Sequence, residues 1–320
     1  MSSPRVIGVD AGGTKLLAGV VDGDLEVHHR IHRLWAGAGR EAVIEAMVAT
    51  VEEALRAAPD VARVGFGIPS LVDWRRGGSL SSVHLPLEGV PFRDLMTERL
   101  GLPVAVDNDA NAAALAEQRC GAARGASDVV MLTLGTGIGG GLVLGGEVYR
   151  GSVGAAAELG HMVVDADGPE CFGGCPGRGC LEALASGSAI ARDGAVAAER
   201  QPDSALGRVV AEDGTVTGTV VTEAALAGDE VALAVVAHAG RRLGAGITGL
   251  VNAFNPEVVV VGGGVMALGE LLLAPARAVV AERALAPSRE VVRIVASSFG
   301  EDSGMLGAAL LAFEEQRGRA

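Results

Sequence analysis

An apolar segment, a glycine-rich turn and a second apolar segment follow one another twice in this sequence, and this repeat constrains the fold more than any other feature. The two turns lie at residues 10–15 and 135–141, and apolar segments at 6–10 and 129–134 precede them. Short apolar runs joined by a glycine turn are typical of β-hairpins. Repetition of the unit predicts two similar halves of βββαβ type, each beginning with a glycine hairpin and facing the other across a cleft.

The remaining pattern alternates strands with helices, as expected of an α/β protein. With 320 residues, 49% of them hydrophobic and 20% charged, the chain is long enough for two domains with aliphatic cores. We expect a small N-terminal α/β domain of residues 1–118 plus 303–320 and a large α/β domain of residues 119–302. Apolar spacing predicts helices at 41–57, 91–100, 110–118, 230–252 and 304–316, strands at 16–21, 63–68, 104–106, 142–144 and 258–261, and a mostly helical region at 186–230 interrupted near 214–221.

The charge balance excludes some partners. The chain has 26 basic and 39 acidic residues, a formal net charge of −13, and such a surface repels nucleic acid and anionic lipid. The uncharged stretch at 129–146 is rich in glycine and shorter than the roughly 20 apolar residues of a membrane span. No secretory signal is recognisable at the N-terminus, which predicts a cytoplasmic location. Lys15, within the first glycine turn, is the only lysine in the chain.

The second glycine turn formally matches the dinucleotide-binding pattern G-x-G-x-x-G at Gly135, Gly137 and Gly140. In that motif the turn opens a helix whose N-terminus takes the pyrophosphate, whereas here residues 141–146 continue as a strand. We therefore favour a phosphate-binding hairpin over a dinucleotide fold. Backbone N–H groups of the two hairpins are expected to hold phosphate from two sides, and Asp10 at the end of the first strand to orient hydrated Mg²⁺.

Three of the four cysteines and one histidine have spacing suited to a metal. Cys171, Cys175 and Cys180 lie within ten residues and follow His161 closely. Three thiolates and one imidazole form a tetrahedral set that suits Zn²⁺. The intervening residues form a glycine-rich knuckle rather than a core segment, and a reducing cytosol disfavours disulfides. Cys120 lies apart, and we interpret it as a buried thiol without a role in the site.

Five motifs, in this order, resemble the ROK family of sugar kinases and repressors. The resemblance continues through residues 255–264 toward the C-terminus and so covers nearly the whole chain. It implies the actin-like ATPase (RNase H-like) fold, with two α/β domains around a central cleft. The motifs are Asp10-Ala-Gly-Gly-Thr-Lys15, Asp107-Asn-Asp-Ala-Asn111, Gly135-Thr-Gly-Ile-Gly-Gly-Gly141, Glu158-Leu-Gly-His161 and Gly179-Cys-Leu-Glu182.

Asp109 is the predicted catalytic base, placed as first residue or cap of the helix that begins near Ala110, where the positive helix end keeps it ionised. The resemblance implies that glutamates and His161 hydrogen-bond sugar hydroxyls, and that zinc fixes the His161 ring. The predicted sugar-binding residues are Gly67, His84, Asn108, Glu158, His161 and Glu182. The predicted nucleotide-binding residues are Asp10, Gly12, Gly13, Thr14, Lys15, Gly135, Thr136, Gly137, Gly262, Gly263, Gly264 and Val265.

Two positions depart from the family pattern. His84 stands where related kinases often carry an asparagine, which puts that sugar contact in question. The cysteine segment begins C-x-x-x-C instead of C-x-C, and Pro176 occupies a position that is usually glycine. Of the four expected zinc ligands, Cys171 is therefore the one left open.

These observations predict an ATP-dependent kinase acting on the primary hydroxyl of a hexose, with D-glucose first and with ATP, Mg²⁺ and structural Zn²⁺ as cofactors. Alternatives are another sugar, such as N-acetylmannosamine, mannose or fructose, and polyphosphate as donor. A sugar-sensing repressor is disfavoured because the first core strand begins near Val6 and the net charge is −13. A small sugar and a nucleotide are the expected partners, nucleic acid and membranes are not, and assembly as a homodimer or homotetramer is expected.

Overall fold

The computed structural model describes residues 4–13, 15–35, 39–82 and 84–317. The chain divides into two compact units, which are described separately. Unit 1 contains residues 1–125, 141–157 and 301–320, and unit 2 contains residues 126–140 and 158–300. Relative to the domain bounds expected from the sequence, unit 1 also takes in residues 119–125, 141–157 and 301–302. The domain bounds themselves stay a prediction.

A five-stranded sheet in the order β3-β2-β1-β4-β7 is the centre of unit 1. β1 and β2 are antiparallel, as are β2 and β3, whereas β1, β4 and β7 are parallel. Glycine in the central strands lets a helix approach closely, because a Cβ on Gly65 would overlap the carbonyl oxygen of Ala308. The strands are β1 (Arg5–Ala11), β2 (Lys15–Asp22), β3 (Val27–Leu34), β4 (Val64–Ile68) and β7 (Val104–Asn108).

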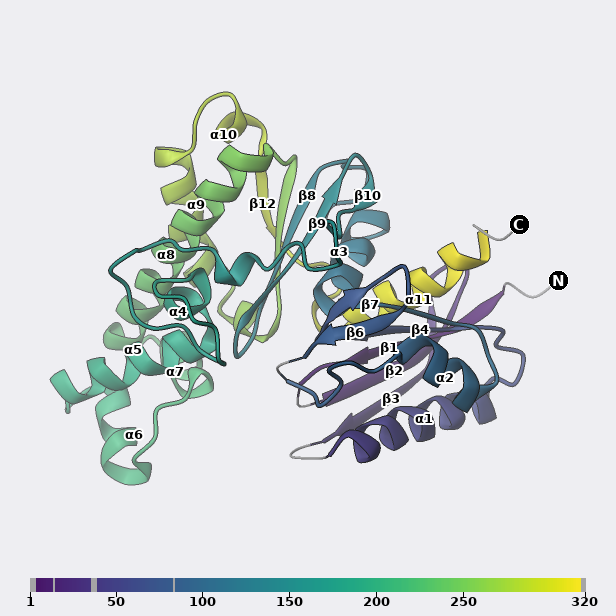
Figure 1. Cartoon of the computed structure of the whole chain (residues 1–320). Helices are drawn as coiled ribbons and strands as arrows, with labels where there is room; N and C mark the ends of the chain where they lie inside the picture. Colours follow the sequence, from purple (N-terminus) through teal and green to yellow (C-terminus); the bar gives the residue numbers. More distant parts are fainter. Residues whose placement is uncertain (1–3, 14, 36–38, 83, 318–320) are drawn as a thin grey trace. The chain divides into compact units, whose positions relative to one another are not determined.

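Helices cover both faces of this sheet (Figure 1). α1 (Arg40–Ala57) and α2 (Phe92–Leu100) lie on one face, and α11 (Ser303–Arg317) lies on the other beside α3 (Asp109–Arg119). β5 (Leu71–Asp73) and β6 (Gly78–Ser81) form a separate antiparallel hairpin. The core beneath α1 and α2 is aliphatic with one aromatic pair, since the rings of Phe66 and Phe92 meet edge to face at 5.2 Å.

A second five-stranded sheet has the order β10-β9-β8-β11-β12, and the boundary between the units crosses β9. β8, β11 and β12 are parallel, and β9 and β10 are antiparallel. In unit 2, helices α8 (Glu230–Phe254) and α9 (Glu270–Arg283) pack closely because Cβ atoms on Gly240 and Gly244 would stand 2.5 Å from carbonyl oxygens of α9. The strands are β8 (Val129–Leu134), β9 (Ile138–Leu144), β10 (Glu147–Val148), β11 (Val258–Gly262) and β12 (Arg293–Ala296).

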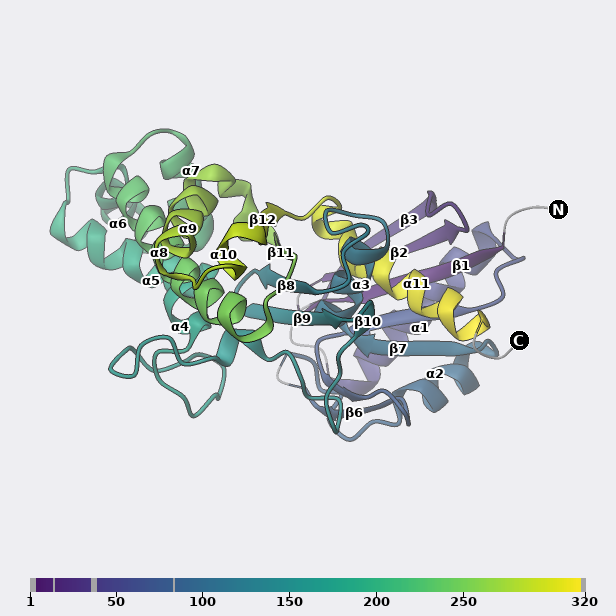
Figure 2. The same ribbon diagram turned by 90° about the horizontal axis from the view of Figure 1, so that it is seen from above.

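Helices α4 to α7 all contact α8, and α6 lies at the outer end of this group (Figure 2). Side chains of Ser186, Ser204, Thr217 and Asp229 cap α5 to α8 by accepting a backbone N–H in the first turn. The helices of unit 2 are α4 (Leu181–Ala185), α5 (Gly187–Arg200), α6 (Ala205–Asp213), α7 (Gly218–Leu226), α8 (Glu230–Phe254), α9 (Glu270–Arg283) and α10 (Ser288–Val291). Single 3₁₀ turns are η1 (Leu159–His161), η2 (Gly264–Leu268) and η3 (Gly300–Asp302), the last at the boundary between the units.

The repeat predicted from the sequence is confirmed, because each sheet places the strand before the glycine turn in the centre, the next two strands antiparallel on one side and two parallel strands on the other. Two boundaries were wrong. The strand after the second turn begins at Ile138 rather than Leu142, and α7 occupies part of the interruption expected near 214–221. Among the described residues, no helix is long and apolar enough to cross a membrane.

Candidate functional site

In unit 1, the end of β7 and the start of α3 carry the Asp107-Asn108-Asp109 motif. Asn108 is the helix cap: its Oδ1 accepts from the backbone N–H groups of Ala110 at 2.9 Å and Asn111 at 3.1 Å. Asp109 is the first residue of the helix, one of the two positions expected, and its Oδ1 accepts from Ala110 N at 2.8 Å. The carboxylate of Asp109 therefore lies at the positive end of α3.

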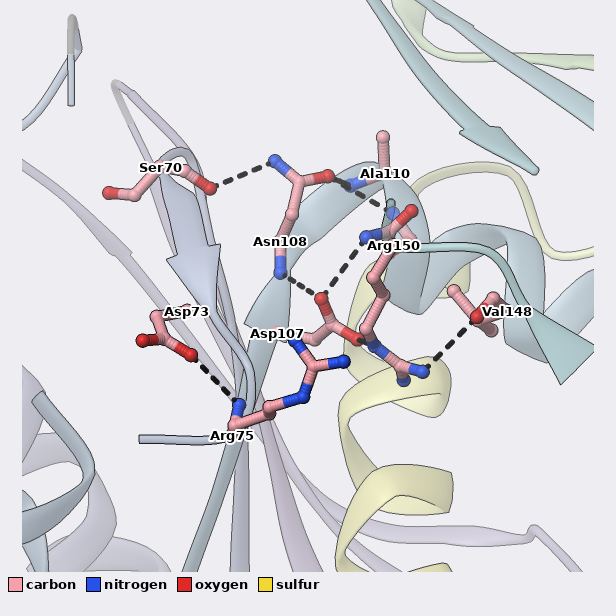
Figure 3. Close-up of polar contacts among 9 residues, drawn as sticks. Ser70, Asp73, Arg75, Asp107, Asn108, Ala110, Val148 and Arg150 are labelled. Atoms are coloured by element: carbon pink, nitrogen blue, oxygen red, sulfur yellow. Dashed lines mark hydrogen bonds and ion pairs between the residues drawn. The ribbon is translucent and has the colours of Figure 1, made fainter. Parts of the chain in front are cut away.

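The other amide atom of Asn108 is also engaged, since Nδ2 donates to the carbonyl oxygen of Ser70 at 3.2 Å (Figure 3). Gly67 in β4 lies against the same helix start, because a Cβ there would stand 3.3 Å from Cα of Asp109. The predicted sugar residues Asn108 and Gly67 and the predicted base are thus brought together within unit 1. His84 lies against the first glycine turn, because its Cβ is 3.1 Å from where a Cβ on Gly13 would be.

Asp10, at the end of β1, has a crowded acidic environment. Burial and the negative charge of Asp109 raise the pKa of Asp10 from 3.8 to about 7, and Glu301 adds to this rise while Lys15 opposes it. The Lys15 ammonium forms an ion pair with Glu301 at 2.8 Å, and this bond lowers the pKa of Glu301. Gly304 in the first turn of α11 makes room for the carboxyl group, since a Cβ there would stand 2.6 Å from Asp10 Oδ2.

In unit 2, the glycine turn at 135–137 rests on the start of α5 through backbone groups. Gly187 N donates to Gly135 O at 2.8 Å, and Ser188 N donates to Thr136 O at 3.3 Å. A Cβ on Gly187 would stand 2.7 Å from Gly135 O and 3.5 Å from Cγ2 of Val265. The second glycine turn is therefore held beside the segment that follows β11.

That segment contains the predicted adenosine residues 262–265. Gly263 has φ of +90°, a conformation that favours glycine, and a Cβ there would overlap the backbone of Leu134 at the end of β8. The structure therefore brings the two predicted nucleotide segments of unit 2 together through Gly187, which the sequence analysis did not single out. A glycine directly after the helix cap Ser186 was the available signal.

His161, Cys171, Cys175 and Cys180 converge in unit 2, and their ligand atoms all lie within 4.8 Å of one another. Cys171 Sγ lies 3.6 Å from His161 Nδ1, so Cys171 belongs to the group despite the altered spacing. Burial and the neighbouring thiols raise the pKa of Cys171 to about 12, and burial also raises the pKa of Cys180. Cys120 is not part of the cluster, and burial raises the pKa of its thiol to about 11.

The two predicted sugar glutamates border this cluster. Glu158 Oε2 lies 3.9 Å from His161 Nε2, the ring nitrogen opposite the thiols, and burial raises the pKa of Glu158. Glu182 Oε2 accepts from Ile138 N at 2.8 Å, and its Oε1 lies 3.8 Å from Cys171 Sγ. A Cβ on Gly137 would overlap Glu182 Oε2. Glu182 thus connects the glycine turn of unit 2 to the cysteine cluster.

The predicted residues therefore form two groups, one in each unit, and Thr14 lies outside the described residues. The residues that contact these groups and that sequence reasoning missed include Arg150, Gly187, Glu301 and Gly304. Each is distant in sequence from its partner, which explains why local motifs did not reveal it.

Comparison with known proteins adds a family and a function. The family model for the ROK family matches residues 6–315. The chain is 36% identical over 312 residues to a glucokinase of Streptomyces coelicolor, and this match covers 96% of this chain and 97% of that protein. It is also 36% identical over 317 residues to an N-acetylmannosamine kinase of Citrobacter koseri, covering 96% of this chain and 98% of that protein.

A solved structure is similar over nearly the whole chain. It is a ROK family glucokinase from Streptomyces griseus in complex with glucose and AMPPNP, with a TM-score of 0.87 and 38% sequence identity. The match covers 97% of this chain and 99% of that one. The structural likeness therefore extends to both units.

Proposed function

This chain belongs to the ROK family, and from that premise we propose that it is a glucokinase, which transfers the γ-phosphoryl group of ATP to the primary hydroxyl of D-glucose. Its fold is the actin-like ATPase fold predicted from the sequence. The observation that carries the proposal is the full-length structural likeness to a glucokinase that holds glucose and an ATP analogue.

Asp109 is the proposed general base. Its carboxylate at the start of α3 accepts the proton of the sugar hydroxyl as that oxygen attacks the γ-phosphorus. In a loose transition state the proton leaves late, so a carboxylate of ordinary basicity suffices. Asn108 and Gly67 support this position: Asn108 caps the helix, and Gly67 leaves room beside Cα of Asp109.

The acidic environment of Asp10 fits a hydrated Mg²⁺ that accompanies the nucleotide. Burial and the charges of Asp109 and Glu301 disfavour the ionised form of Asp10, and a divalent cation would relieve that repulsion. When bound, Mg²⁺ neutralises charge that develops on the transferred phosphoryl group. Lys15 and the backbone of Gly12 and Gly13 are the proposed phosphate contacts of unit 1.

In unit 2, the proposed nucleotide contacts are the glycine turn at 135–137 and residues 262–265. Support comes from their placement side by side through Gly187 and from the absence of side chains at the glycines, which allows close backbone approach. The adenosine borders Gly263, Gly264 and Val265, and the phosphates border the turn.

The donor set of three thiols and one imidazole within 4.8 Å fits a structural Zn²⁺ held by His161, Cys171, Cys175 and Cys180. Zinc would fix the tautomer and rotamer of His161 through Nδ1, which leaves Nε2 to face the sugar beside Glu158. Glu158, Glu182 and His161 are the proposed acceptors and donors for sugar hydroxyls. Homodimeric or homotetrameric assembly and a cytoplasmic location stay predictions.

A coupled assay tests the function and separates it from its alternatives. The purified chain is given ATP and, in turn, glucose, mannose, fructose and N-acetylmannosamine, and glucose is then tested with polyphosphate. We expect the highest kcat/KM for glucose with ATP. A higher value for N-acetylmannosamine would move the assignment to the other kinase that shares 36% identity with the chain. A higher value with polyphosphate would change the donor.

A further inference from the structure

Arg150 follows β10 in unit 1 and reaches the end of β7, where the proposed base begins its helix. Its Nε donates to Asp107 Oδ2 at 2.6 Å, and its Nη1 donates to Val148 O at 3.2 Å (Figure 3). Asp107 is only 2% exposed. The ion pair therefore joins two chain segments across 43 residues of sequence at a nearly dry position.

The second oxygen of Asp107 acts on the motif itself. Oδ1 accepts from the backbone N–H of Asn108 at 2.8 Å and from Nδ2 of Asn111 at 3.1 Å. Asn111 Oδ1 is buried and has no hydrogen-bond partner among the described residues, so Asp107 determines which way this amide faces. Arg150 fixes Oδ2, Oδ1 then fixes Asn108, and Asn108 caps the helix whose first residue is Asp109.

Stability alone does not account for such a pair. Replacing a buried ion pair by apolar side chains of similar volume is often neutral or stabilising, whereas removing one partner is strongly destabilising. A planar guanidinium, by contrast, fixes the direction of its hydrogen bonds and so orients its acceptor. We propose that Arg150 is a positioning residue for phosphoryl transfer, acting through Asp107 on the orientation of Asn108 and Asp109; this inference rests on the proposed kinase function.

Arg75 offers a matched control within the same unit. Its guanidinium carbon lies 4.8 Å from the ring centroid of Trp74, and that of Arg150 lies 5.4 Å from the same centroid. Arg75 also donates to a backbone carbonyl, that of Ser152, at 3.2 Å. The two arginines thus make similar stacking and backbone contacts, but the contact with Asp107 belongs to Arg150.

The test compares Arg150→Met, Arg75→Met and the double variant Asp107→Leu/Arg150→Met, with rates normalised to the folded fraction. Mispositioning a reacting group can cost about 10²-fold, so we expect Arg150→Met to lower kcat by about that factor while the KM values for glucose and ATP change little. The double variant removes the unpaired buried charge, so its Tm should recover toward that of Arg75→Met while kcat stays low. Because both residues act as a unit, its kcat should match that of Arg150→Met.

Each contrary outcome has a distinct meaning. If the double variant regains kcat together with Tm, the ion pair is structural only and the positioning role is wrong. If Arg75→Met loses as much kcat as Arg150→Met, stacking on Trp74 rather than the contact with Asp107 is what matters, and the proposal is again overturned. A wild-type chain inactive toward every sugar of the panel would overturn the kinase function itself, and the role of Arg150 with it.

Discussion

The two glycine turns occupy the same place in two sheets of the same strand order, yet their surroundings differ in kind. The turn of unit 1 lies among charged side chains, with Asp10 before it and the Lys15–Glu301 ion pair after it. In the turn of unit 2, backbone carbonyl groups accept hydrogen bonds from N–H groups of α5, and the carboxylate of Glu182 accepts from the N–H of Ile138. The two turns thus share a backbone position in the fold, and the charged or uncharged character of each turn comes from the residues packed around it.

Asp109→Asn gives the largest expected effect, because it removes the proposed proton acceptor from unit 1. General-base catalysis contributes about 10²–10⁴-fold, so kcat should fall at least that far. The amide oxygen can still accept from Ala110 N, so the unfolding free energy should change by no more than about 1 kcal/mol. Glucose affinity, measured by calorimetry, should change little. A variant kcat above about a tenth of the wild-type value would exclude this role for Asp109, because the loss would be smaller than a general base contributes.

Removing the predicted metal set tests the cluster of three thiols and one imidazole in unit 2. Metal analysis should find about one zinc per chain, as expected for a four-ligand structural site. Even loss of a residue that orients a metal ligand typically costs about 10–100-fold in metal affinity or activity, so loss of the proposed ligand in Cys180→Ser should raise the glucose KM by at least about tenfold and lower Tm. Cys120→Ser is the matched control, since Cys120 donates to Ala116 O outside the cluster. Zinc-free wild-type protein with an unchanged glucose KM would contradict the proposal.

Gly135→Ala and Gly137→Ala separate the proposed contact of the second turn with the nucleotide from its contact with Glu182. The sequence alone suggests that a side chain at Gly137 damages ATP binding more than glucose binding. The structure adds a reason to expect an effect on glucose binding as well, because a Cβ on Gly137 would overlap Glu182 Oε2, whereas a Cβ on Gly135 meets nothing within 4 Å. Displacing Glu182 loses a charged hydrogen bond, worth about 1.5–3 kcal/mol, so Gly137→Ala should raise the glucose KM about tenfold or more.

Gly135→Ala should leave the glucose KM unchanged and raise the KM for ATP alone. Steady-state kinetics with each substrate varied in turn gives both constants for both variants. Equal effects of the two variants on glucose would mean that Glu182 does not bind the sugar, and the link between turn and cysteine cluster would then be structural.

The strands on either side of each glycine turn, the turns themselves and the cysteine cluster could be predicted because each depends on residues close together in sequence. The apolar runs around Asp10 and around Gly135 indicated two hairpins, and cysteine spacing indicated the group that the structure brings together. The shared strand order followed from that repeat. These are local properties of the chain.

Contacts between distant segments could not be predicted. Nothing near Arg150 in the sequence indicates a buried partner 43 residues earlier, and nothing near Gly304 indicates that its missing side chain makes room for Asp10. The position of His84 is also set by packing, which places it against Gly13. The residues that pack against a site are therefore harder to predict from sequence than the residues of the site itself.

The last expected effect is on stability rather than on catalysis, and it concerns the charge of Asp10 and the acidic character of the first turn. Its pKa is raised from 3.8 in the unfolded chain to about 7 in the folded protein, so the folded state binds the extra proton between these values. The unfolding free energy should therefore fall as pH rises from about 4 to about 7 and level off above pH 7.

Asp10→Asn removes this dependence. Without nucleotide or Mg²⁺, its Tm should match wild type near pH 4 and exceed it at pH 8, by about 2–4 °C per kcal/mol. With MgATP the order should reverse, because the ionised carboxylate then faces a cation. A Tm difference that does not vary with pH would show that Asp10 keeps an ordinary pKa, and the first turn would then not be the more strongly charged of the two.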